Sequence, residues 1–418
     1  MTRTTKLFAA AALGMVLGAS ACHNDELFRP ANFVPIDPLF ARYVSMGNSI
    51  TAGYQSDGIL DSTQLQAYPV LLANAMGSPF FAPLMTRPGC RPPFTNVFTG
   101  TRLTPTGFPP STATSCYLRR VPSVPPPYIS NTAVPGAEVL DIYSNGDTAS
   151  NSNTLTTFFL GGLTQVQMME RARPTFVSVW IGNNDVLGAA TTYAGDSTRI
   201  TPVAAFQARY GAMLNSIAAV APRGVVLIGV ANVVGVANRA GIPPTQPPAN
   251  GVPYFAYGST YYALDQAGAI PGPFVAAATC APPRGDSVLV PFPVGGGLIA
   301  TGGTLTCNEV TTVQPAEAVK LATTVAGYNA YIAAQATARG WAYFDPNVAL
   351  DSLRRIPTQV AFFPNFGSPT PTPCSASPFG LAFTCDAVHP SAATHKLIAN
   401  ALRAVINTKY GTAVPVIP

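Results

Sequence analysis

The sequence predicts an α/β domain of three layers, in which helices cover both faces of a central parallel sheet. Short apolar and β-branched runs alternate with helical segments along the chain, a pattern typical of parallel sheets. The run 175–181 is apolar almost throughout, as in a strand that is buried on both faces. Because no internal repeat interrupts this order, we expect one elaborated domain over residues 39–410.

Each expected element rests on a local signal. Continuous apolar and β-branched runs predict the strands 42–46, 175–181, 225–230 and 341–344. Amphipathic or alanine-rich segments predict the helices 68–76, 163–173, 202–220, 315–339 and 391–407. Proline opens the third of these helices at Pro202, and glycine follows the first and fourth at Gly77 and Gly340.

Three insertions interrupt the alternation, at 82–128, 240–312 and 356–385. Each is crowded with turn-forming residues, proline above all, and each contains two cysteines. In an exported chain an even number of cysteines predicts a disulfide framework, and sequence neighbours are one of several possible connectivities. The links expected on this basis are Cys90–Cys116, Cys280–Cys307 and Cys374–Cys385.

Residues 1–22 have the features of an export signal. Arg3 and Lys6 precede an apolar run over 7–17, and small residues follow up to Cys22. The polar, proline-bearing segment 23–38 is then expected to be a tether.

Two interpretations of the end of this signal remain open. Ala19 and Ala21 fit ordinary signal-peptidase cleavage, whereas small residues directly before Cys22 resemble a bacterial lipobox. Cys22 is also the cysteine left over when the other six are paired, which leaves it free to carry a lipid. We therefore expect an exported protein of the cell envelope, anchored in the membrane through Cys22 and otherwise periplasmic or secreted.

Charge and composition exclude several classes of function. The net charge of +5 includes two residues of the signal, so the remainder carries 5 − 2 = +3, which is too little to indicate a nucleic-acid partner. After the signal, no segment reaches the roughly 18 uninterrupted apolar residues of a membrane span. Histidines and cysteines show no zinc-ligand spacing, so neither a metal nor another cofactor is expected.

Four short motifs follow one another and carry the chemistry of the chain. The first and third directly follow predicted strands, and parallel strands place such residues at the same edge of a sheet. The four motifs are Gly47-Asn48-Ser49-Ile50, the loop Asn131–Ala137 with Gly136, Gly182-Asn183-Asn184-Asp185, and Asp386-Ala387-Val388-His389-Pro390.

These motifs resemble those of the SGNH, or GDSL, hydrolase superfamily of serine esterases and lipases, whose letters Ser, Gly, Asn and His occur here in order. The resemblance covers roughly residues 40–408. It implies a three-layer α/β/α flavodoxin-like SGNH hydrolase fold with a central parallel sheet and long disulfide-pinned loop insertions. It also implies Ser49 as the nucleophile and an oxyanion hole formed by Ser49, Gly136 and Asn184.

One departure from the family pattern is Asn48, where the family commonly has Asp. Asn is isosteric with Asp and still accepts a hydrogen bond, so the turn geometry is expected to survive without the negative charge. Gly285-Asp286-Ser287-Val288 matches the family letters more literally. However, it precedes an apolar run instead of following one, so we do not expect Ser287 to be the nucleophile.

The histidine count indicates which residue acts as the base. The chain contains only His23, His389 and His395. His23 lies in the tether, and His395 is expected on the solvated surface of the last helix. His389 is therefore the expected base, and Asp386, three residues earlier, is placed to orient its imidazole.

The sequence thus predicts an exported serine esterase or lipase that hydrolyses carboxylic esters through a Ser-His-Asp acyl-enzyme mechanism. Acyl or acetyl esters of lipids or glycans are the expected substrates. Two alternatives remain: a non-catalytic glycan- or lipid-binding surface protein, and an acyltransferase that uses the same site.

Overall fold

The structure is a computed structural model, and it describes residues 35–97, 99–120, 126–144, 153–191, 197–233, 261–263, 275–280, 289–291, 304–308, 312–353, 356, 358–360 and 373–418. The export signal 1–22 with Cys22, the tether up to residue 34 and most of the insertion 240–312 lie outside the described residues.

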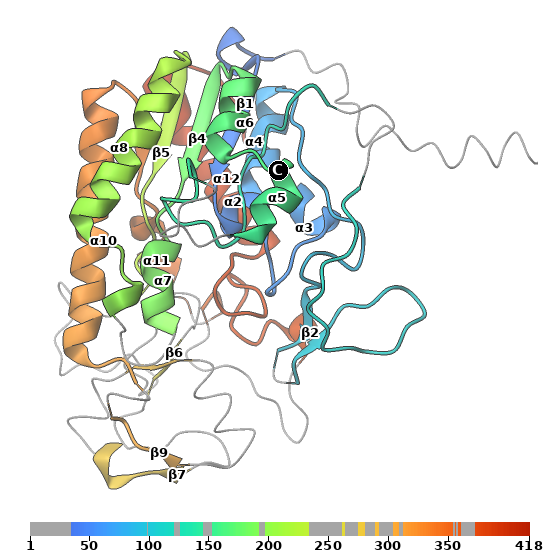
Figure 1. Cartoon of the computed structure of the whole chain (residues 1–418), viewed down its shortest axis with the longest axis vertical. Coiled ribbons are helices and arrows are strands. Elements are labelled where there is room, and N and C mark those ends of the chain that lie inside the picture. The colour runs from blue at the N-terminus through green and yellow to red at the C-terminus, as the bar shows by residue number, and fades with distance from the viewer. Residues whose placement is uncertain are drawn as a thin grey trace, which may run out of the picture.

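A four-stranded parallel sheet forms the centre, in the order β1-β4-β5-β10 (Figure 1). Its strands are β1 (Tyr43–Gly47), β4 (Phe176–Trp180), β5 (Gly224–Ile228) and β10 (Ala342–Phe344). The expected strands and the α/β fold are therefore confirmed, with bounds that shift by one or two residues.

A further segment lies beside the free edge of β1. Thr132 N–H donates to Ser45 O at 2.9 Å, Val134 N–H donates to Gly47 O at 3.2 Å, and Asn131 forms a parallel bridge with Ser45. With this segment counted, the spatial order of the sheet follows the flavodoxin-like pattern 2-1-3-4-5. In that pattern ligands bind at the carboxyl ends of the two strands where the strand order reverses, which are here β1 and β4.

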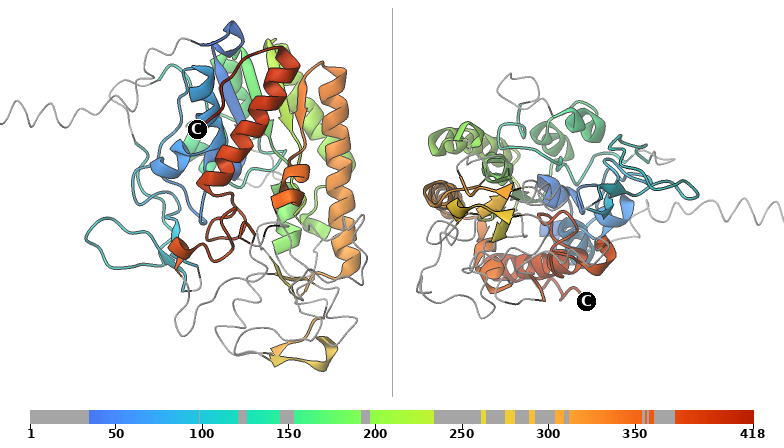
Figure 2. Two further views of the ribbon diagram at one scale, coloured as in Figure 1. Left: turned by 180° about the vertical axis from the view of Figure 1, so that it is seen from behind. Right: turned by 90° about the horizontal axis from the view of Figure 1, so that it is seen from below.

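Helices cover both faces of the sheet, as Figures 1 and 2 show. One face packs against α5 (Thr154–Leu160), α6 (Gln165–Ala172), α7 (Asn184–Thr191), α8 (Val203–Ala219) and α10 (Pro315–Ala338). The other face packs against α4 (Tyr68–Met76) and α12 (Ala392–Tyr410). Alternate residues of β4 divide between the two: Val177 and Val179 join the first cluster, and Phe176 and Trp180 the second.

The remaining elements are short and belong to loops. They are η2 (Pro38–Phe40), α2 (Ser49–Ala52), α3 (Asp61–Leu65), η3 (Ser197–Arg199), η5 (Ala278–Cys280), α11 (Pro346–Leu353) and η6 (Cys374–Ala376). Three two-stranded sheets pair β2 (Phe94–Asn96) with β3 (Thr101–Arg102), β6 (Tyr261–Ala263) with β8 (Leu289–Pro291), and β7 (Val275–Ala276) with β9 (Thr304–Leu305). None of the described helices is long and apolar enough to span a membrane.

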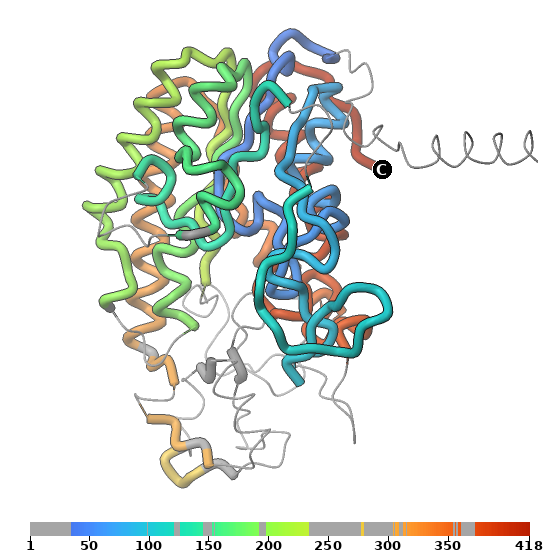
Figure 3. Tube along the Cα trace, turned by 45° about the vertical axis from the view of Figure 1, so that its right-hand side comes forward, coloured from blue at the N-terminus to red at the C-terminus, as the bar shows by residue number. Residues whose placement is uncertain are grey.

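Two of the expected disulfides are present. Cys90–Cys116 closes the insertion that extends away from the helices in Figure 3, and Cys374–Cys385 closes a loop ahead of α12. Cys307 is also disulfide-bonded. The side chain of Cys280 lies outside the described residues, so the link Cys280–Cys307 stays a prediction.

The structure corrects the expectation that His395 lies on the solvated surface. His395 is fully buried, as are Ala399, Leu402 and Ile406, and their spacing of four, three and four residues forms one helical stripe. This stripe faces the sheet and α4, where Tyr68 N–H donates to His395 Nδ1 at 3.3 Å. The expectation was wrong because the periodicity of the last helix outweighs the polarity of one imidazole.

Burial first, and the nearby charge of His389 second, lower the pKa of His395 to about 3. In the unfolded chain a histidine titrates near pH 6.5, so below that pH the unfolded state takes up a proton that the folded state does not. We therefore expect His395 to cost about 2 kcal/mol of folding free energy at pH 5 relative to pH 7.5, and nothing above pH 7.5.

The measurement is urea unfolding of the wild type and of His395→Asn at both pH values. The change in unfolding free energy between pH 7.5 and 5 should be smaller in the variant by about that amount. An equal change in both proteins would show that His395 is not held neutral.

Candidate active site

Ser49 begins α2 directly after β1 ends at Gly47. Asn48 caps this helix, because its Oδ1 accepts a hydrogen bond from Ile50 N–H at 3.2 Å. Asn48 therefore forms the turn through its amide oxygen, which is the function that an Asp would also supply. Ser49 and Asn48 both line the pocket described below.

The backbone of Gly47, which precedes Asn48 and Ser49, is held through both its N–H and its carbonyl oxygen. Gln165 Oε1 accepts from Gly47 N–H at 2.9 Å, and Gln165 Nε2 donates to Gly47 O at 2.8 Å. A Cβ at Gly47 would lie 2.5 Å from Trp180 O and 2.4 Å from Thr51 Oγ1, so only glycine fits beside β4. This clamp fixes where β1 releases the chain toward Ser49.

The structure brings Ser49, His389 and Asp386 into one hydrogen-bonded row. His389 Nε2 lies 2.8 Å from Ser49 Oγ, and His389 Nδ1 lies 2.7 Å from Asp386 Oδ2. An ionised Asp386 only accepts hydrogen bonds, so Nδ1 carries the proton and Nε2 is free to accept the one from Ser49. The aromatic ring of Tyr54 covers the imidazole at a centroid distance of 4.9 Å.

The side chain of Asp386 is only 9% exposed and is surrounded by donors. Its Oδ1 accepts from the backbone N–H of Val388 (3.0 Å) and His389 (2.9 Å) and from the Thr384 hydroxyl (3.1 Å). Its Oδ2 accepts from Asp57 N–H at 2.6 Å in addition to His389. Burial alone would raise the pKa of this carboxyl. The charge of His389 and the hydrogen bonds from His389 and Val388 outweigh burial and lower the pKa to about 2, so Asp386 is ionised at neutral pH.

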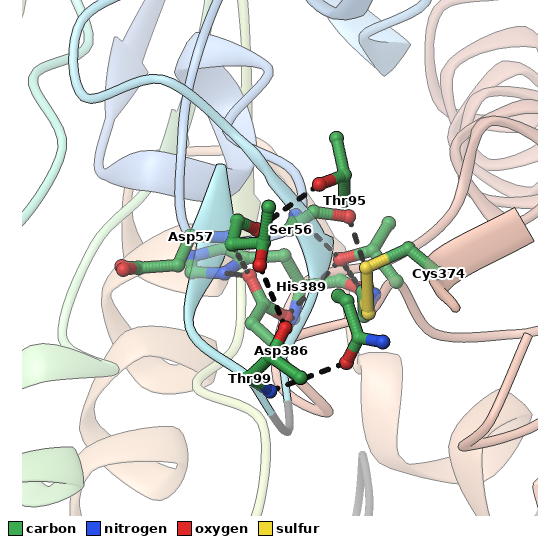
Figure 4. The surroundings of a disulfide bond; sticks show 11 residues. Ser56, Asp57, Thr95, Thr99, Cys374, Asp386 and His389 are labelled. Carbon is green, nitrogen blue, oxygen red and sulfur yellow. Dashed lines mark hydrogen bonds and ion pairs between the residues drawn. A yellow bond between two sulfur atoms is a disulfide. The ribbon is translucent and has the colours of Figure 1, made fainter. Parts of the chain in front are cut away.

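The loop that carries Asp386 and His389 is closed at several points. The disulfide Cys374–Cys385 ends one residue before Asp386 (Figure 4). Thr384 N–H donates to His389 O at 2.8 Å, and Phe383 forms a bridge with Pro390. These contacts hold the two residues on the same short turn.

The second and third motifs contact each other. Asn184 Nδ2 donates to Ala137 O at 2.8 Å, and Val139 N–H donates to Asp185 Oδ2 at 2.9 Å. From the other side, Asn153 Nδ2 donates to Pro135 O at 2.7 Å. The loop around Gly136 is therefore tied to the turn that begins α7.

Gly136 has a φ of +80° and is exposed. No described residue accepts a hydrogen bond from the backbone N–H of Gly136 or Ser49. Both N–H groups are thus available to an external acceptor, as an oxyanion hole requires.

A pocket of about 380 Å³ opens beside Ser49. Ser49, His389 and Asn184 all line it, while Gly136 and Asp386 are not among the described residues that do. The structure therefore places three of the sequence-predicted site residues on one cavity, with Asp386 behind His389. Cys22 and the side chain of Cys280 lie outside the described residues.

Sequence reasoning missed Gln165, Thr384, Tyr54 and Asp57. Gln165 forms hydrogen bonds with the backbone of Gly47, and the Thr384 hydroxyl donates to the carboxylate of Asp386. Asp57 contributes a backbone N–H, which no residue type announces. The structure also shows no group of three or more His, Cys, Asp or Glu side chains in its described part that is arranged to hold a metal ion.

Comparisons with known proteins give one family. The model of the GDSL-like lipase/acylhydrolase family matches residues 43–402, a range that includes all four motifs. No curated protein matches the chain.

Among solved structures, the acetylxylan esterase Axe2 from Geobacillus stearothermophilus is 11% identical with a TM-score of 0.39, and the match covers 89% of this chain and 94% of that one. LAE5, an alpha/beta hydrolase enzyme from the metagenome of Lake Arreo, Spain, is 13% identical with a TM-score of 0.38, and the match covers 89% and 97%.

Proposed function

Because the chain belongs to the GDSL-like lipase/acylhydrolase family of serine hydrolases that act on esters, we propose that Ser49, His389 and Asp386 carry out this reaction. The observation that carries the proposal is the row of short contacts from Ser49 Oγ through the imidazole to Asp386, 2.8 Å and 2.7 Å long. Hydroxyl, base and orienting carboxylate thus have the geometry that acyl transfer needs.

In this mechanism Ser49 Oγ attacks the ester carbonyl carbon while His389 Nε2 takes the hydroxyl proton. The tetrahedral intermediate collapses, the bond to the alcohol oxygen breaks, and His389 returns the proton to that oxygen. Water then repeats the sequence on the acyl-enzyme and releases the carboxylic acid. Asp386 stays ionised throughout and stabilises the imidazolium, in keeping with its lowered pKa of about 2.

The developing oxyanion requires donors that are already in position. The candidates are the backbone N–H groups of Ser49 and Gly136 and the side-chain amide of Asn184. Asn184 lines the pocket with Ser49, and its hydrogen bond to Ala137 O ties it to the residue after Gly136. This link supports a joint role of the Gly136 loop and the Asn184 side chain in stabilising the negative charge of the oxyanion.

The location of the reaction is a further part of the proposal. Residues 1–22 support export, and the two disulfides support an oxidising compartment. Cys22 follows small residues at the end of the signal, which supports a lipid anchor in the cell envelope. Cleavage by ordinary signal peptidase after Ala19 and Ala21 would instead give a periplasmic or secreted protein. In either location, the proposed substrates are acyl or acetyl esters of lipids or glycans.

The nucleophile can be tested directly with a fluorophosphonate probe, which reacts with activated serine hydroxyls. We expect the probe to label Ser49, identified by peptide mass spectrometry, and Ser49→Ala to lose both labelling and ester hydrolysis. Ser62→Ala, which changes an exposed serine of α3, should retain both. Labelling of Ser287 would overturn the assignment, and transfer of the acyl group to an added alcohol in place of hydrolysis would identify an acyltransferase.

The oxyanion role of Asn184 predicts a change in turnover rather than in binding. Asn184→Ala should lower kcat by about 10²–10³-fold with little change in KM, because the donor acts mainly on the transition state. Asn153→Ala is the matched control, since it removes another amide that anchors the same loop, at Pro135 O. An equal loss of kcat in both variants would mean that Asn184 only holds the loop.

A further inference from the structure

The pocket beside Ser49 has a polar end and an apolar remainder. Besides Ser49, the polar side chains that line it are Asn48, Asn183, Asn184, Asn232, Ser352, His389 and Thr394. Farther along, the walls are Trp180 and Phe344 from the sheet edge, Leu350 and Leu353 from α11, and Ile398 and Ala401 from α12. Apart from His389, no described residue that lines the pocket is ionisable.

The hydroxyls in the apolar part are already satisfied within the chain. Thr394 Oγ1 donates to Ala382 O at 2.8 Å, and Ser352 Oγ donates to Val348 O at 3.1 Å. A sugar in this part would bury hydroxyls against apolar walls, at a cost for each unmade hydrogen bond. Leu397 adds an apolar rim, because it lines the pocket and its side chain is 52% exposed. The lining therefore suits hydrocarbon.

Of the two arms of an ester, the acyl arm gains more from such a pocket. The acyl group stays bonded to Ser49 Oγ after the alcohol departs. Contacts to the acyl chain therefore stabilise the transition states of acylation and deacylation, whereas contacts to the alcohol serve only the first step.

We propose that this pocket binds the acyl chain of the substrate and makes the protein selective for medium-chain aliphatic esters over acetyl esters. At about 30 Å³ per packed methylene-sized group, a cavity of about 380 Å³ has room for at most roughly a dozen carbons. The inference rests on the proposed function, since it assigns a substrate class to the same Ser49 site.

The test is kcat/KM for p-nitrophenyl acetate, butyrate, octanoate and palmitate, which share one alcohol. We expect kcat/KM to rise by up to about fourfold per added methylene as far as octanoate, and then to level off or fall. Ala401→Phe should fill the pocket and lower kcat/KM for octanoate far more than kcat/KM for acetate, so that most of the gain for octanoate is lost. Ala404→Phe, the same change at an exposed position of α12, should behave as the wild type.

A second readout does not depend on turnover. In Ser49→Ala, p-nitrophenyl octanoate should raise the melting temperature and the acetate should not, because only a ligand that binds the folded state stabilises it. This shift together with the absence of ester hydrolysis in the wild type would contradict the proposed function and leave the acyl pocket standing. Equal kcat/KM for acetate and octanoate without a shift, or a preference for octyl acetate over methyl octanoate, would overturn the acyl pocket alone.

A second inference comes from an independent set of contacts, those of the tight turn 55–58. Gln55 and Gly58 exchange two backbone hydrogen bonds of 2.7 Å and 3.1 Å, so the two residues between them form a two-residue hairpin turn. These are Ser56 and Asp57, both with a φ of +54°, a conformation that costs energy for residues other than glycine. A residue keeps such an unfavourable backbone conformation only where the surrounding contacts enforce it.

The contacts of the turn lead to the acid of the active site (Figure 4). Ser56 N–H donates to Thr384 Oγ1 at 2.8 Å, and Asp57 N–H donates to Asp386 Oδ2 at 2.6 Å. In return, Cys385 N–H donates to Ser56 Oγ at 3.2 Å. The turn therefore aims a backbone donor at the oxygen that also binds His389 Nδ1.

The side chain of Asp57 is held by two arginines from the insertion 82–128. Arg91 Nη1 lies 3.0 Å from Asp57 Oδ2, and Arg102 Nη2 donates to the same oxygen. Arg102 is only 5% exposed, and its Nη1 also donates to Asp57 O at 3.0 Å. Tyr54, which covers His389, donates to Asp57 Oδ1 at 3.1 Å.

We infer that Asp57 is a positioning residue, through which the insertion fixes Asp386 and the imidazole on it. Asp57→Gly keeps the backbone N–H and tolerates the positive φ, but it removes the carboxylate that pairs with Arg91 and Arg102. We expect it to lower kcat and the rate of fluorophosphonate labelling by about 10- to 100-fold, with KM within about twofold. Asp57→Asn, which keeps one acceptor oxygen, should recover part of the loss.

The matched control is Asp61→Gly, which breaks the ion pair of Asp61 with Arg120 of the same insertion (2.9 Å) without contact to Asp386. It should leave kcat unchanged. Arg91→Met, at a more exposed partner of Asp57, gives a milder variant if Asp57→Gly does not fold, and it too should lower kcat and not KM. Equal kcat for Asp57→Gly and Asp61→Gly, or a rise in KM at constant kcat, would overturn the assignment.

Discussion

In the parallel ladder between β1 and β4, Gly47 lies opposite Trp180, so the two strands release the chain at the same edge of the sheet. Ser49 follows one strand and Asn183 and Asn184 the other, which brings the Ser49 hydroxyl and the two amide side chains onto one pocket. The register requires that β1 end without a side chain, because a Cβ at Gly47 would meet Trp180 O. The positions of the other site residues are set relative to this edge.

The parts of the fold that follow from local pattern could be predicted. The apolar run of β4 and the alanine-rich α10 carry their signal within a single segment. His395 could not be placed in the same way, because its polarity suggested solvent while the stripe it shares with Leu402 turns it inward. The segment that extends the sheet beside β1 was also missed, since Asn131 and Thr132 are polar and join the ladder only through the backbone.

The candidate site divides in the same way. Ser49, Asn184, Asp386 and His389 lie in motifs whose residue types indicate their chemistry. The support behind Asp386 does not, because Asp57 lies 329 residues away and offers a backbone N–H. Local patterns do not encode contacts between segments so far apart, and the insertion of Arg102 resembled no known motif. The site residues that the motifs indicate are thus held in place by contacts that can be seen only in the folded chain.

The separation of 340 residues between Ser49 and His389 also has a temporal consequence. At about 5–20 residues per second, the ribosome adds His389 roughly 20–70 s after Ser49. During that interval the growing chain holds Ser49 without Asp386 and His389, and it lacks α12, which forms one wall of the pocket. The proposed catalytic centre is therefore incomplete during synthesis, and its hydrogen-bonded row of Ser49, His389 and Asp386 forms only when the last part of the chain folds onto the sheet.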